Sequence, residues 1–501
     1  MTSLRKRVVI VGAGFSGLAI ASMLARHGFD VLVVEKNPTP GGRAQVYERD
    51  GFKFDMGPSW YLMPDIFQRF FGLFGKSPSD YYQLRRLDPS YRIFFDADDW
   101  VDISADFAKN LDLFESLEPG AGNKLREYVR IAGQEYEAAV GEFLYKDYRS
   151  LLDFLNRKTM IEGRKLHVFE NIDRYARRYF RSEKLRRILE YSMVFLGGSP
   201  SNTPAMYSLL SHVDFNLGVW YPVGGMGSVV KALRDLAESC GAEFLFGCEA
   251  KKIEVRGRQA VSVETDSGSL PADAVVVSAD YPHSELDLLS PRHQTYGSRY
   301  WRRRVLAPSA LLMYLGLNKP VPSLLHHSLS FQHDWVEHFN SIFDSPAWPE
   351  KPSYYMCCPS KSDDSVAPPG CENLVVLVPV AAGIEDDDTT REQFADRILG
   401  YLEGLLGQPI RESIVSRTLF SQRDFRSVFN AYRGTALGLS HTLLQSAVFR
   451  PSHRSKKVSN LYYTGQYTHP GIGLPMALIS AEIVAGIIEK EQIRRGSVST
   501  L

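Results

Sequence analysis

The sequence predicts an α/β protein, and three separated segments of the chain lead to this prediction. Residues 8–35 read as a strand, a glycine turn, a helix and a second strand, which is the βαβ unit of a parallel sheet. Residues 219–278 repeat a glycine-rich turn, a helix and short strands. Residues 460–489 read as a strand, a glycine turn and an apolar helix. We therefore expect one parallel-sheet lobe that is assembled from three segments.

The first segment carries a dinucleotide-binding fingerprint of the Rossmann type. Gly12, Gly14 and Gly17 follow an apolar strand with the spacing G-x-G-x-x-G. In order, these glycines permit a tight turn, a close approach of backbone to pyrophosphate, and close helix–strand packing. The phosphates would lie at the start of the helix, where the dipole favours negative charge. Glu35 ends the second strand, where a carboxylate accepts hydrogen bonds from ribose hydroxyls.

The same stretch has a second interpretation as a targeting segment. Residues 8–25 contain no charge and follow the basic residues Arg5, Lys6 and Arg7, as in a secretory signal or a membrane span. Neither a cleaved peptide nor a span requires three glycines at fingerprint spacing, or a second strand ending in an acid. The pattern favours the nucleotide-binding unit.

The remaining segments predict the rest of the molecule. Residues 91–103 read as a β-hairpin and residues 107–196 as mostly helical. In the second α/β segment we expect a helix over 228–239 and strands over 242–246, 251–255, 260–265 and 274–278. The predicted division assigns 1–75, 216–290 and 455–501 to a cofactor-binding domain, 76–106 and 291–454 to a mixed-sheet substrate domain, and 107–215 to a helical region expected to contact a membrane.

Composition limits the function classes. The formal net charge is zero over 501 residues, so no global charge points to a nucleic-acid partner. The five cysteines form no C-x-x-C, which favours reduced thiols in a cytoplasmic compartment. The histidines form no H-x-x-x-H, and the adjacent pair His326–His327 is not expected to point at one metal. We therefore expect no metal site. Aromatic residues make up 12%, which suits either a large apolar ligand or an aromatic core.

One basic stretch stands out against this neutral total. Residues 156–187 contain eleven Lys and Arg against four Asp and Glu. Arg174, Arg177, Arg178 and Arg181 recur at helical spacing between aromatic residues. A basic amphipathic helix of this kind lies on anionic membrane surfaces. A solvated helix face is the alternative, and the sequence leaves both open.

Three further motifs together resemble one enzyme family. The first is PGGRA at 40–44 with FDMGP at 54–58, the second is GVWYPVGGMG at 218–227, and the third is NLYYTG at 460–465 with THPGIGLP at 468–475. This set resembles the bacterial and fungal phytoene desaturase family of carotenoid enzymes. The resemblance covers nearly the whole chain.

The resemblance implies a flavoprotein of the FAD-dependent amine-oxidase superfamily. The glycine turn would hold the pyrophosphate of FAD, Glu35 the adenosine ribose, and the backbone of Ala250 the adenine. Gly42 and Arg43 would lie along the diphosphate or flavin, and residues 57–59 would border the isoalloxazine. The cofactor-binding residues expected are Gly12, Ala13, Gly14, Ser16, Gly17, Glu35, Lys36, Gly42, Arg43, Gly57, Pro58, Ser59, Ala250, Gly465, Gly473, Leu474 and Pro475.

Gly465 and the helix start at 473–475 would face the N1/O2 side of the flavin. Reduced flavin carries negative charge there, and helix N-termini stabilise anions.

The implied reaction is dehydrogenation of a C–C single bond in a long polyene carotenoid, with hydride passing to flavin. Oxygen or a membrane quinone would reoxidise the flavin. Asp153, a lone carboxylate among apolar residues, is the candidate proton acceptor, with a helix cap or a salt-bridge partner as the alternative. Because the substrate dissolves in lipid, we expect peripheral attachment to the cytoplasmic face of the cell membrane.

Other functions remain open at this point. Within flavin chemistry, they are desaturation of hydroxylated or C30 carotenoids and FAD-dependent carotene isomerisation. Outside it, they are a flavin amine oxidase acting on small polar amines, and a flavin-free binding protein of the GDP-dissociation-inhibitor sort. The complete glycine fingerprint argues against the flavin-free protein, and the lack of a cysteine near the third motif argues against covalently bound flavin.

Overall fold

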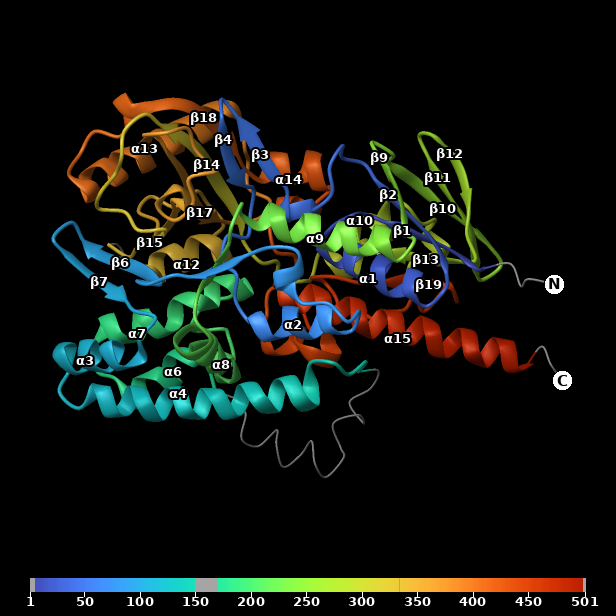
Figure 1. Ribbon diagram of the computed structural model, residues 1–501, viewed down its shortest axis with the longest axis horizontal. Coiled ribbons are helices and arrows are strands. Elements are labelled where there is room, and N and C mark those ends of the chain that lie inside the picture. Colours follow the sequence, from blue (N-terminus) through green and yellow to red (C-terminus); the bar gives the residue numbers. More distant parts are fainter. Residues whose placement is uncertain (1–4, 149–169, 333, 499–501) are drawn as a thin grey trace.

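The computed structural model describes residues 5–148, 170–332 and 334–498, and these residues form three layers of structure (Figure 1). A parallel sheet with its helices, on the right in Figure 1, makes the first. A mixed sheet makes the second, and a group of helices packed below that sheet makes the third. The α/β fold class and the mixed sheet predicted from the sequence are confirmed.

The parallel sheet joins the three separated segments of the chain. Its strand order is β19-β13-β1-β2-β9, and every neighbouring pair is parallel. Val8–Val11 of β1 lies between β2 and β13, so the first βαβ unit is at the centre. The strands are β1 (Arg7–Val11), β2 (Asp30–Glu35), β9 (Glu243–Phe246), β13 (Ala274–Val277) and β19 (Leu461–Tyr463).

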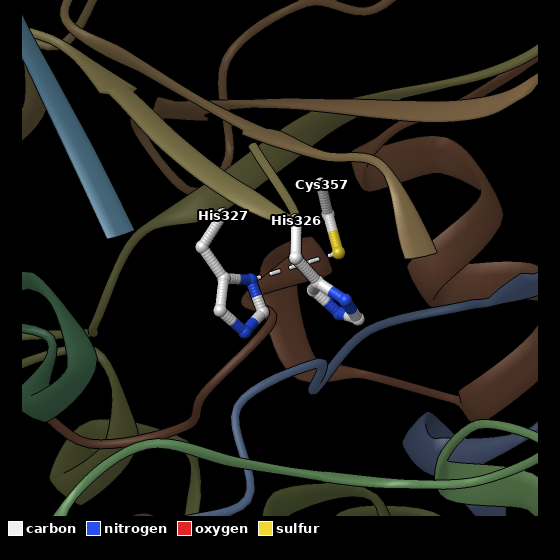
Figure 2. Close-up of side chains that lie close together, drawn as sticks. All are labelled: His326, His327 and Cys357. Atoms are coloured by element: carbon white, nitrogen blue, oxygen red, sulfur yellow. Dashed lines mark hydrogen bonds between the residues drawn. The ribbon is translucent and has the colours of Figure 1, made fainter. Parts of the chain in front are cut away.

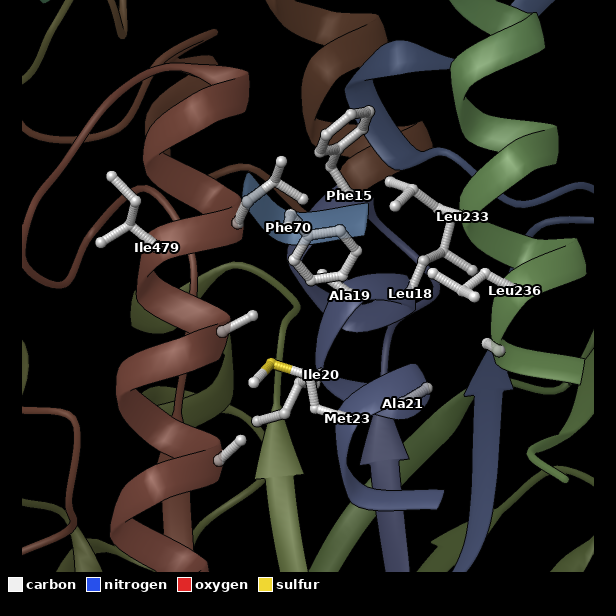
Figure 3. Packing of buried hydrophobic residues seen from close by; sticks show 14 of the residues in the cluster. Phe15, Leu18, Ala19, Ile20, Ala21, Met23, Phe70, Leu233, Leu236 and Ile479 are labelled. Carbon is white, nitrogen blue, oxygen red and sulfur yellow. The ribbon is translucent and has the colours of Figure 1, made fainter. Parts of the chain in front are cut away.

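Helix α1 (Phe15–Arg26) is the most deeply buried helix of this lobe. Every residue from Phe15 to Ala25 is buried, so the helix is apolar on all sides. It packs between α9 (Met226–Ser239) and α15 (Leu474–Val498), with Ile20 and Met23 among the side chains that fill the space (Figure 3). This burial explains the long uncharged run in the sequence without a targeting segment.

Other elements of the lobe cover its edges. Helix α9 begins at Met226, two residues before the predicted start, and α15 continues nine residues beyond the predicted end. A strand that the sequence did not predict, β12, completes an antiparallel sheet. The elements are α2 (Pro64–Gly72), α10 (Tyr281–Leu286) and α11 (Ser298–Trp301), the sheet of β10 (Ala250–Arg256), β11 (Gln259–Thr265) and β12 (Gly268–Pro271), and the two-stranded pairs β3 (Val46–Arg49) with β4 (Phe52–Asp55) and β5 (Leu84–Arg86) with β8 (Trp220–Pro222).

The mixed sheet has the strand order β18-β14-β17-β16-β15-β6-β7. Only the β15–β6 pair is parallel. Alternate side chains of β14 face opposite sides: Leu311 and Met313 pack towards α13, whereas Leu312 and Tyr314 face the rest of the molecule. The elements are β6 (Tyr91–Asp96), β7 (Asp99–Ile103), β14 (Ser309–Leu317), β15 (His327–Ser330), β16 (Tyr354–Cys357), β17 (Glu372–Val380) and β18 (Ile414–Phe420), with α12 (Trp335–Phe343), α13 (Asp388–Leu406) and α14 (Gln422–Phe429).

The third layer is helical, as the sequence predicts. Its helices are α3 (Phe107–Leu117), α4 (Ala121–Ala138), α6 (Ile172–Tyr179), α7 (Glu183–Glu190) and α8 (Leu209–His212). Two π-helical turns, η3 (Ala139–Phe143) and η7 (Val213–Leu217), extend α4 and α8. None of the described helices combines the length and apolar composition needed to cross a bilayer.

Helix α6, in the described part of the basic stretch 156–187, differs from the predicted basic amphipathic helix, and residues 156–169 of that stretch lie outside the described residues. It ends at Tyr179, so Arg181 lies beyond it. Its apolar side chains, Ile172 and Tyr175, are buried against α4 and α7 and do not face solvent. Arg177 pairs with Asp173 at 2.9 Å, which reduces the free positive charge of the exposed face. The apolar face of α6 is therefore part of the core.

Short helical turns complete the chain. They are η1 (Gly42–Ala44), η2 (Pro78–Asp80), η5 (Tyr191–Leu196), η6 (Ala205–Ser208), η8 (Pro291–His293), η9 (Pro359–Lys361), η10 (Arg411–Ser413), η11 (Tyr432–Gly434), η12 (Leu443–Gln445) and η13 (Ala447–Phe449).

Candidate functional site

A single large cavity of about 1540 Å³ connects the three layers. Drug-sized ligands occupy pockets of roughly 300–1,000 Å³, so this cavity has room for two large ligands side by side or end to end. One part of its wall is the carboxyl edge of the parallel sheet, with the glycine turn and Glu35. The other part is formed by aromatic and aliphatic side chains of the mixed sheet and the helical layer.

The glycine turn is shaped for a ligand. Gly14 has an ordinary φ of −70°, and a Cβ built on it would meet only Ser278 Oγ, at 3.8 Å. Protein packing therefore does not require glycine at position 14. A Cβ on Gly17 would instead lie 2.1 Å from Gly12 O, so that glycine is needed for helix–strand packing. The space left open at Gly14 fits the pyrophosphate of a dinucleotide.

Glu35 is held beside this turn by backbone groups. Its Oε2 accepts a hydrogen bond from Ala13 N at 2.8 Å, and its Oε1 accepts from Asn37 N at 2.9 Å. Oε1 also accepts from the Asn37 side-chain amide at 2.8 Å. An ionised carboxylate offers about four acceptor positions, so Oε2 can still accept from a ribose hydroxyl. The neighbouring Lys36 lines the same wall and donates to Ser427 O and Asn430 Oδ1.

Arg43 lines the same cavity as the glycine turn. Its Nη2 is 3.5 Å from Asp280 Oδ2, and its Nε is buried without a hydrogen-bond partner in the described part of the chain. A Cβ added at Gly42 would lie 3.2 Å from Gly14 Cα, and a Cβ added at Gly57 would lie 2.6 Å from Arg43 O. The backbone is thus closely packed on the protein side and open on the cavity side. An unpaired guanidinium N–H beside this opening fits an anionic ligand.

The other predicted cofactor-binding residues also line the cavity. Ser16 lies 2.9 Å from Ser278, oxygen to oxygen, and Gly465 N donates to Ser480 Oγ at 3.0 Å. Gly473 is in the left-handed region, with φ +123°, directly before the first turn of α15. The structure brings together, in one wall, Gly12, Gly14, Ser16, Glu35, Lys36, Gly42, Arg43, Gly57, Pro58, Ser59, Ala250, Gly465, Gly473, Leu474 and Pro475. Ala13 and Gly17 lie in the same turn behind that wall, whereas Asp153 lies outside the described residues.

The remaining wall is mainly apolar, and sequence reasoning did not assign it. Trp60 stands at its centre, with its ring near those of Tyr91, Tyr191, Phe195 and Tyr355. Its lining includes Leu62, Phe67, Phe143, Val194, Leu196, Met206, Leu209, Leu210, Val213, Leu312, Leu329, Phe331, Trp335, Phe339, Ile342, Leu377, Val448 and Phe449. These side chains come from many elements that are distant in sequence, so no local motif marks them.

Two adjacent histidines and a cysteine converge behind this wall (Figure 2). Their candidate ligand atoms all lie within 4.8 Å of one another. This convergence corrects the expectation that the adjacent histidines do not point at one metal, because their ligand atoms and that of Cys357 are close enough together to hold an ion. His327 Nδ1 lies 2.6 Å from the Tyr355 hydroxyl and 3.8 Å from Cys357 Sγ. For comparison, two ligand atoms of a tetrahedral zinc site lie about 3.3–3.8 Å apart, because the metal–ligand bonds are about 2.0–2.3 Å long.

Burial keeps this cluster uncharged. Loss of hydration lowers the pKa of His326 to about 3 and raises the pKa of the Cys357 thiol to about 12. His327 also stacks on Trp60, with ring centroids 4.2 Å apart. The cluster therefore supports the aromatic wall as a hydrogen-bonded core. All five cysteines, as the sequence suggests, are free thiols.

Comparisons with known proteins agree with this geometry. The family of flavin-containing amine oxidoreductases matches residues 15–488. A carotenoid 3,4-desaturase of Haloarcula japonica is 47% identical, with 95% of this chain and 97% of that protein aligned. A zeta-carotene-forming phytoene desaturase of Myxococcus xanthus is 34% identical, with 96% and 93% aligned.

Solved structures share the fold at low sequence identity. An oxidoreductase from Methanosarcina mazei superposes with a TM-score of 0.65 at 15% identity, covering 96% of this chain and all of that chain. A putrescine oxidase variant gives a TM-score of 0.61 at 15% identity, covering 97% and 99%. A Rab GDI from Plasmodium falciparum gives 0.55 at 12% identity, covering 96% and 98%.

Proposed function

The chain belongs to the flavin-containing amine oxidoreductase family and, within it, to the carotenoid desaturases, and from that premise we propose that it is an FAD-dependent desaturase of a long polyene. The observation that carries the proposal is the composite cavity, which joins a dinucleotide-type wall to an extended apolar space. When bound, the flavin would accept hydride, which is the oxidative chemistry that the reaction requires.

FAD would lie along the wall built from the three sequence segments. Backbone N–H groups at the start of α1 would meet the pyrophosphate, and Glu35 would accept from the ribose. The guanidinium of Arg43, which keeps an unpaired Nε–H, would donate to an anionic group of the cofactor. Residues 57–59 would border the isoalloxazine, since they line the same cavity as the glycine turn and directly precede Trp60 in the chain.

The apolar wall would hold and orient the polyene. A polyene offers no hydrogen bonds and is bound by burial of its apolar surface, which contributes roughly 25 cal/mol per Å². A small polar amine would need polar or charged partners in the same space, and the described lining supplies few of them. This composition favours the desaturase over an amine oxidase. The open space at Gly14 favours a cofactor-binding protein over a flavin-free one.

The cavity also reaches the surface at an apolar segment, which we call the mouth: Leu443, Leu444 and Phe449. These three side chains line the cavity, and they are 37%, 68% and 43% exposed. Val305, 42% exposed, lies beside them because its N–H donates to Gln445 Oε1 at 2.9 Å.

The basic residues Arg302 and Arg303, both exposed, closely precede Val305. An apolar patch with basic neighbours fits an anionic lipid surface. We therefore place the proposed peripheral membrane contact, on the cytoplasmic face, at the mouth instead of at α6. Substrate would enter there directly from lipid, and oxygen or a membrane quinone would reoxidise the flavin.

Product analysis tests this function and identifies the substrate. The protein would be expressed in cells that accumulate phytoene, in cells that accumulate its C30 homologue, and in cells that accumulate a 1-hydroxy carotenoid. We expect at least one of these hosts to form a pigment with a longer conjugated system. An isomer with unchanged hydrogen content would instead support a carotene isomerase. Unchanged carotenoids in all three hosts, with folded protein present, would refute the proposal.

A further inference from the structure

Among the described residues, five carboxyl side chains line the cavity: Glu35, Glu170, Asp214, Glu249 and Asp280. Three of them belong to the proposed cofactor wall, where Glu35 accepts from Ala13 N, Asp280 pairs with Arg43 and Glu249 lies 3.9 Å from Lys36. Glu170 forms an ion pair with Arg178 at 2.7 Å. Asp214 alone is set among aromatic and apolar side chains.

Asp214 lies in the π-helical turn η7 and has one occupied and one vacant oxygen. Its Oδ2 accepts hydrogen bonds from the Tyr91 hydroxyl at 2.6 Å and from the Tyr191 hydroxyl at 3.2 Å. Its Oδ1 is buried and has no hydrogen-bond partner among the described residues. A buried acceptor without a partner costs free energy, and π-helical turns are frequent at functional sites. The two tyrosines fix the carboxyl group and leave Oδ1 available.

The aromatic wall connects this carboxyl group to the proposed flavin position. Trp60 directly follows Ser59, which would border the isoalloxazine. The Trp60 ring centroid lies 5.4 Å from that of Tyr91 and 6.0 Å from that of Tyr191. Asp214 is therefore linked to the flavin-bordering residues through the Trp60 ring and the two tyrosine rings. Asp214, Trp60 and Tyr191 line the same cavity as residues 57–59, so a polyene in that space would have both the carboxyl group and the flavin-bordering residues on its walls.

We propose that Asp214 is the proton acceptor of the desaturation, with Tyr91 and Tyr191 as positioning residues. This inference rests on the proposed function. In the reaction, one C–H bond of the substrate leaves as hydride, with its electron pair, to the flavin. The electron pair of the adjacent C–H bond forms the second bond of the new C=C, and its proton passes to Oδ1 of Asp214. Two substrate hydrogens are lost and the flavin gains two electrons, so atoms and electrons balance.

The environment of Asp214 suits this role at neutral pH. Burial raises the pKa of Asp214 to about 7, while the hydrogen bonds from Tyr91 and Tyr191 lower the pKa and so partly oppose this shift. Among the described residues, burial and the two tyrosine hydrogen bonds are the causes of the shift, and none of them is a charged side chain. A base with a pKa near the working pH is the most effective proton acceptor. His469 also lines the cavity with an unpaired Nδ1, but burial lowers the pKa of His469 to about 3, so its imidazole holds a proton poorly.

Asp214→Asn tests the proposal in the full-length holoenzyme. Asparagine keeps the shape and can still accept from the two tyrosines, but it cannot take up the proton. We expect kcat to fall about 10²–10⁴-fold, the usual contribution of a general base, while FAD affinity and polyene binding stay within about twofold. For the unmodified enzyme, kcat/KM should rise with pH to a plateau through an apparent pKa near 7, and this limb should vanish in the variant.

Matched variants separate a chemical role from a structural one. Glu135→Gln alters a buried carboxyl whose pKa burial also raises to about 7 but which does not line the cavity, and it should leave kcat and the pH limb unchanged. Tyr191→Phe removes a hydrogen bond that lowers the pKa of Asp214, so it should move the limb to higher pH. If Asp214→Asn does not fold, the shift of the pH limb in Tyr191→Phe decides whether Asp214 is the proton acceptor.

The outcomes distinguish the two proposals. An enzyme that desaturates a carotenoid, whose Asp214→Asn variant keeps its kcat and pH limb, would overturn the role of Asp214 and leave the proposed function standing. If Asp153→Asn, and not Asp214→Asn, lowers kcat and abolishes the pH limb, the proton acceptor is Asp153 instead. Failure of the unmodified protein to desaturate any carotenoid would refute the proposed function itself.

Discussion

The fingerprint glycines illustrate how a single residue type serves different physical ends. Gly17 is required by packing, because any Cβ would meet Gly12 O at 2.1 Å. Gly14 is not required by packing, because its φ is ordinary and an added Cβ would have its nearest neighbouring atom, Ser278 Oγ, 3.8 Å away. The sequence pattern treats both glycines alike, and the structure separates a glycine that packing requires from one that packing leaves open.

This difference predicts that valine at the two positions lowers different quantities, FAD affinity at position 14 and the free energy of unfolding at position 17. Gly14→Val should fold normally but lose FAD affinity by about 100-fold or more, which corresponds to about 2.8 kcal/mol, because the side chain fills the pyrophosphate position. Gly17→Val should lower the free energy of unfolding by about 1–3 kcal/mol or more through overpacking. Thermal unfolding and FAD titration of both variants measure these effects.

A control is available in α13. A Cβ added at Gly404 would have no neighbouring atom within 4 Å, and this glycine does not line the cavity, so Gly404→Ala should leave FAD binding unchanged. Normal FAD affinity in Gly14→Val would show that the pyrophosphate lies elsewhere.

At the scale of the element, the short turns η12 and η13 carry the mouth of the cavity. The sequence drew attention to a basic helical stretch, yet the apolar side chains of α6 are buried. Helical periodicity shows that a helix has an apolar face, but it does not show what covers that face. Leu443, Leu444 and Phe449 have no periodic pattern, so only their exposure beside the cavity identifies them.

Replacing all three mouth residues with serine should weaken attachment to vesicles that contain anionic lipid. A fully buried Leu or Phe contributes about 1.5–3 kcal/mol, so the partition coefficient should fall at least about tenfold. Vesicle flotation measures the partition coefficient. Desaturation of a substrate presented in detergent should fall less than desaturation of a substrate in vesicles, since detergent delivers the substrate without vesicle attachment.

Val415 provides the matched control for the mouth. It is 53% exposed on β18 but does not line the cavity, so Val415→Ser should bind vesicles normally. Equal losses in Val415→Ser and in the triple variant would show that the mouth is not the lipid-binding surface.

For the whole molecule, local patterns predicted more of the fold than of the site. The βαβ unit, the hairpin at 91–103 and the final strand and helix could be predicted because short-range periodicity and turn residues determine them. The parallel pairing of β6 with β15 joins residues more than 200 positions apart, and tertiary packing alone sets that register. The convergence of the adjacent histidines His326 and His327 with Cys357, and the placement of Asp214 beside Tyr91, depend on packing between separate segments.

The cofactor wall was predictable because its residues sit in turns with a strict backbone geometry. The apolar wall was not, because any large side chain facing the same space would serve. This asymmetry explains why seventeen candidate cofactor-binding residues could be named from motifs, fifteen of which line the cavity, whereas Trp60 and the other apolar side chains of the cavity appear only in three dimensions.

Anaerobic mixing of the FAD-loaded protein with a carotenoid substrate in lipid vesicles tests the central claim most directly. The account predicts that oxidised-flavin absorption decays at the same rate as absorption of a more conjugated polyene appears, with one double bond formed per flavin reduced. Flavin that stays oxidised with phytoene, with its C30 homologue and with a 1-hydroxy carotenoid, in a protein that binds FAD and is folded, would contradict the account.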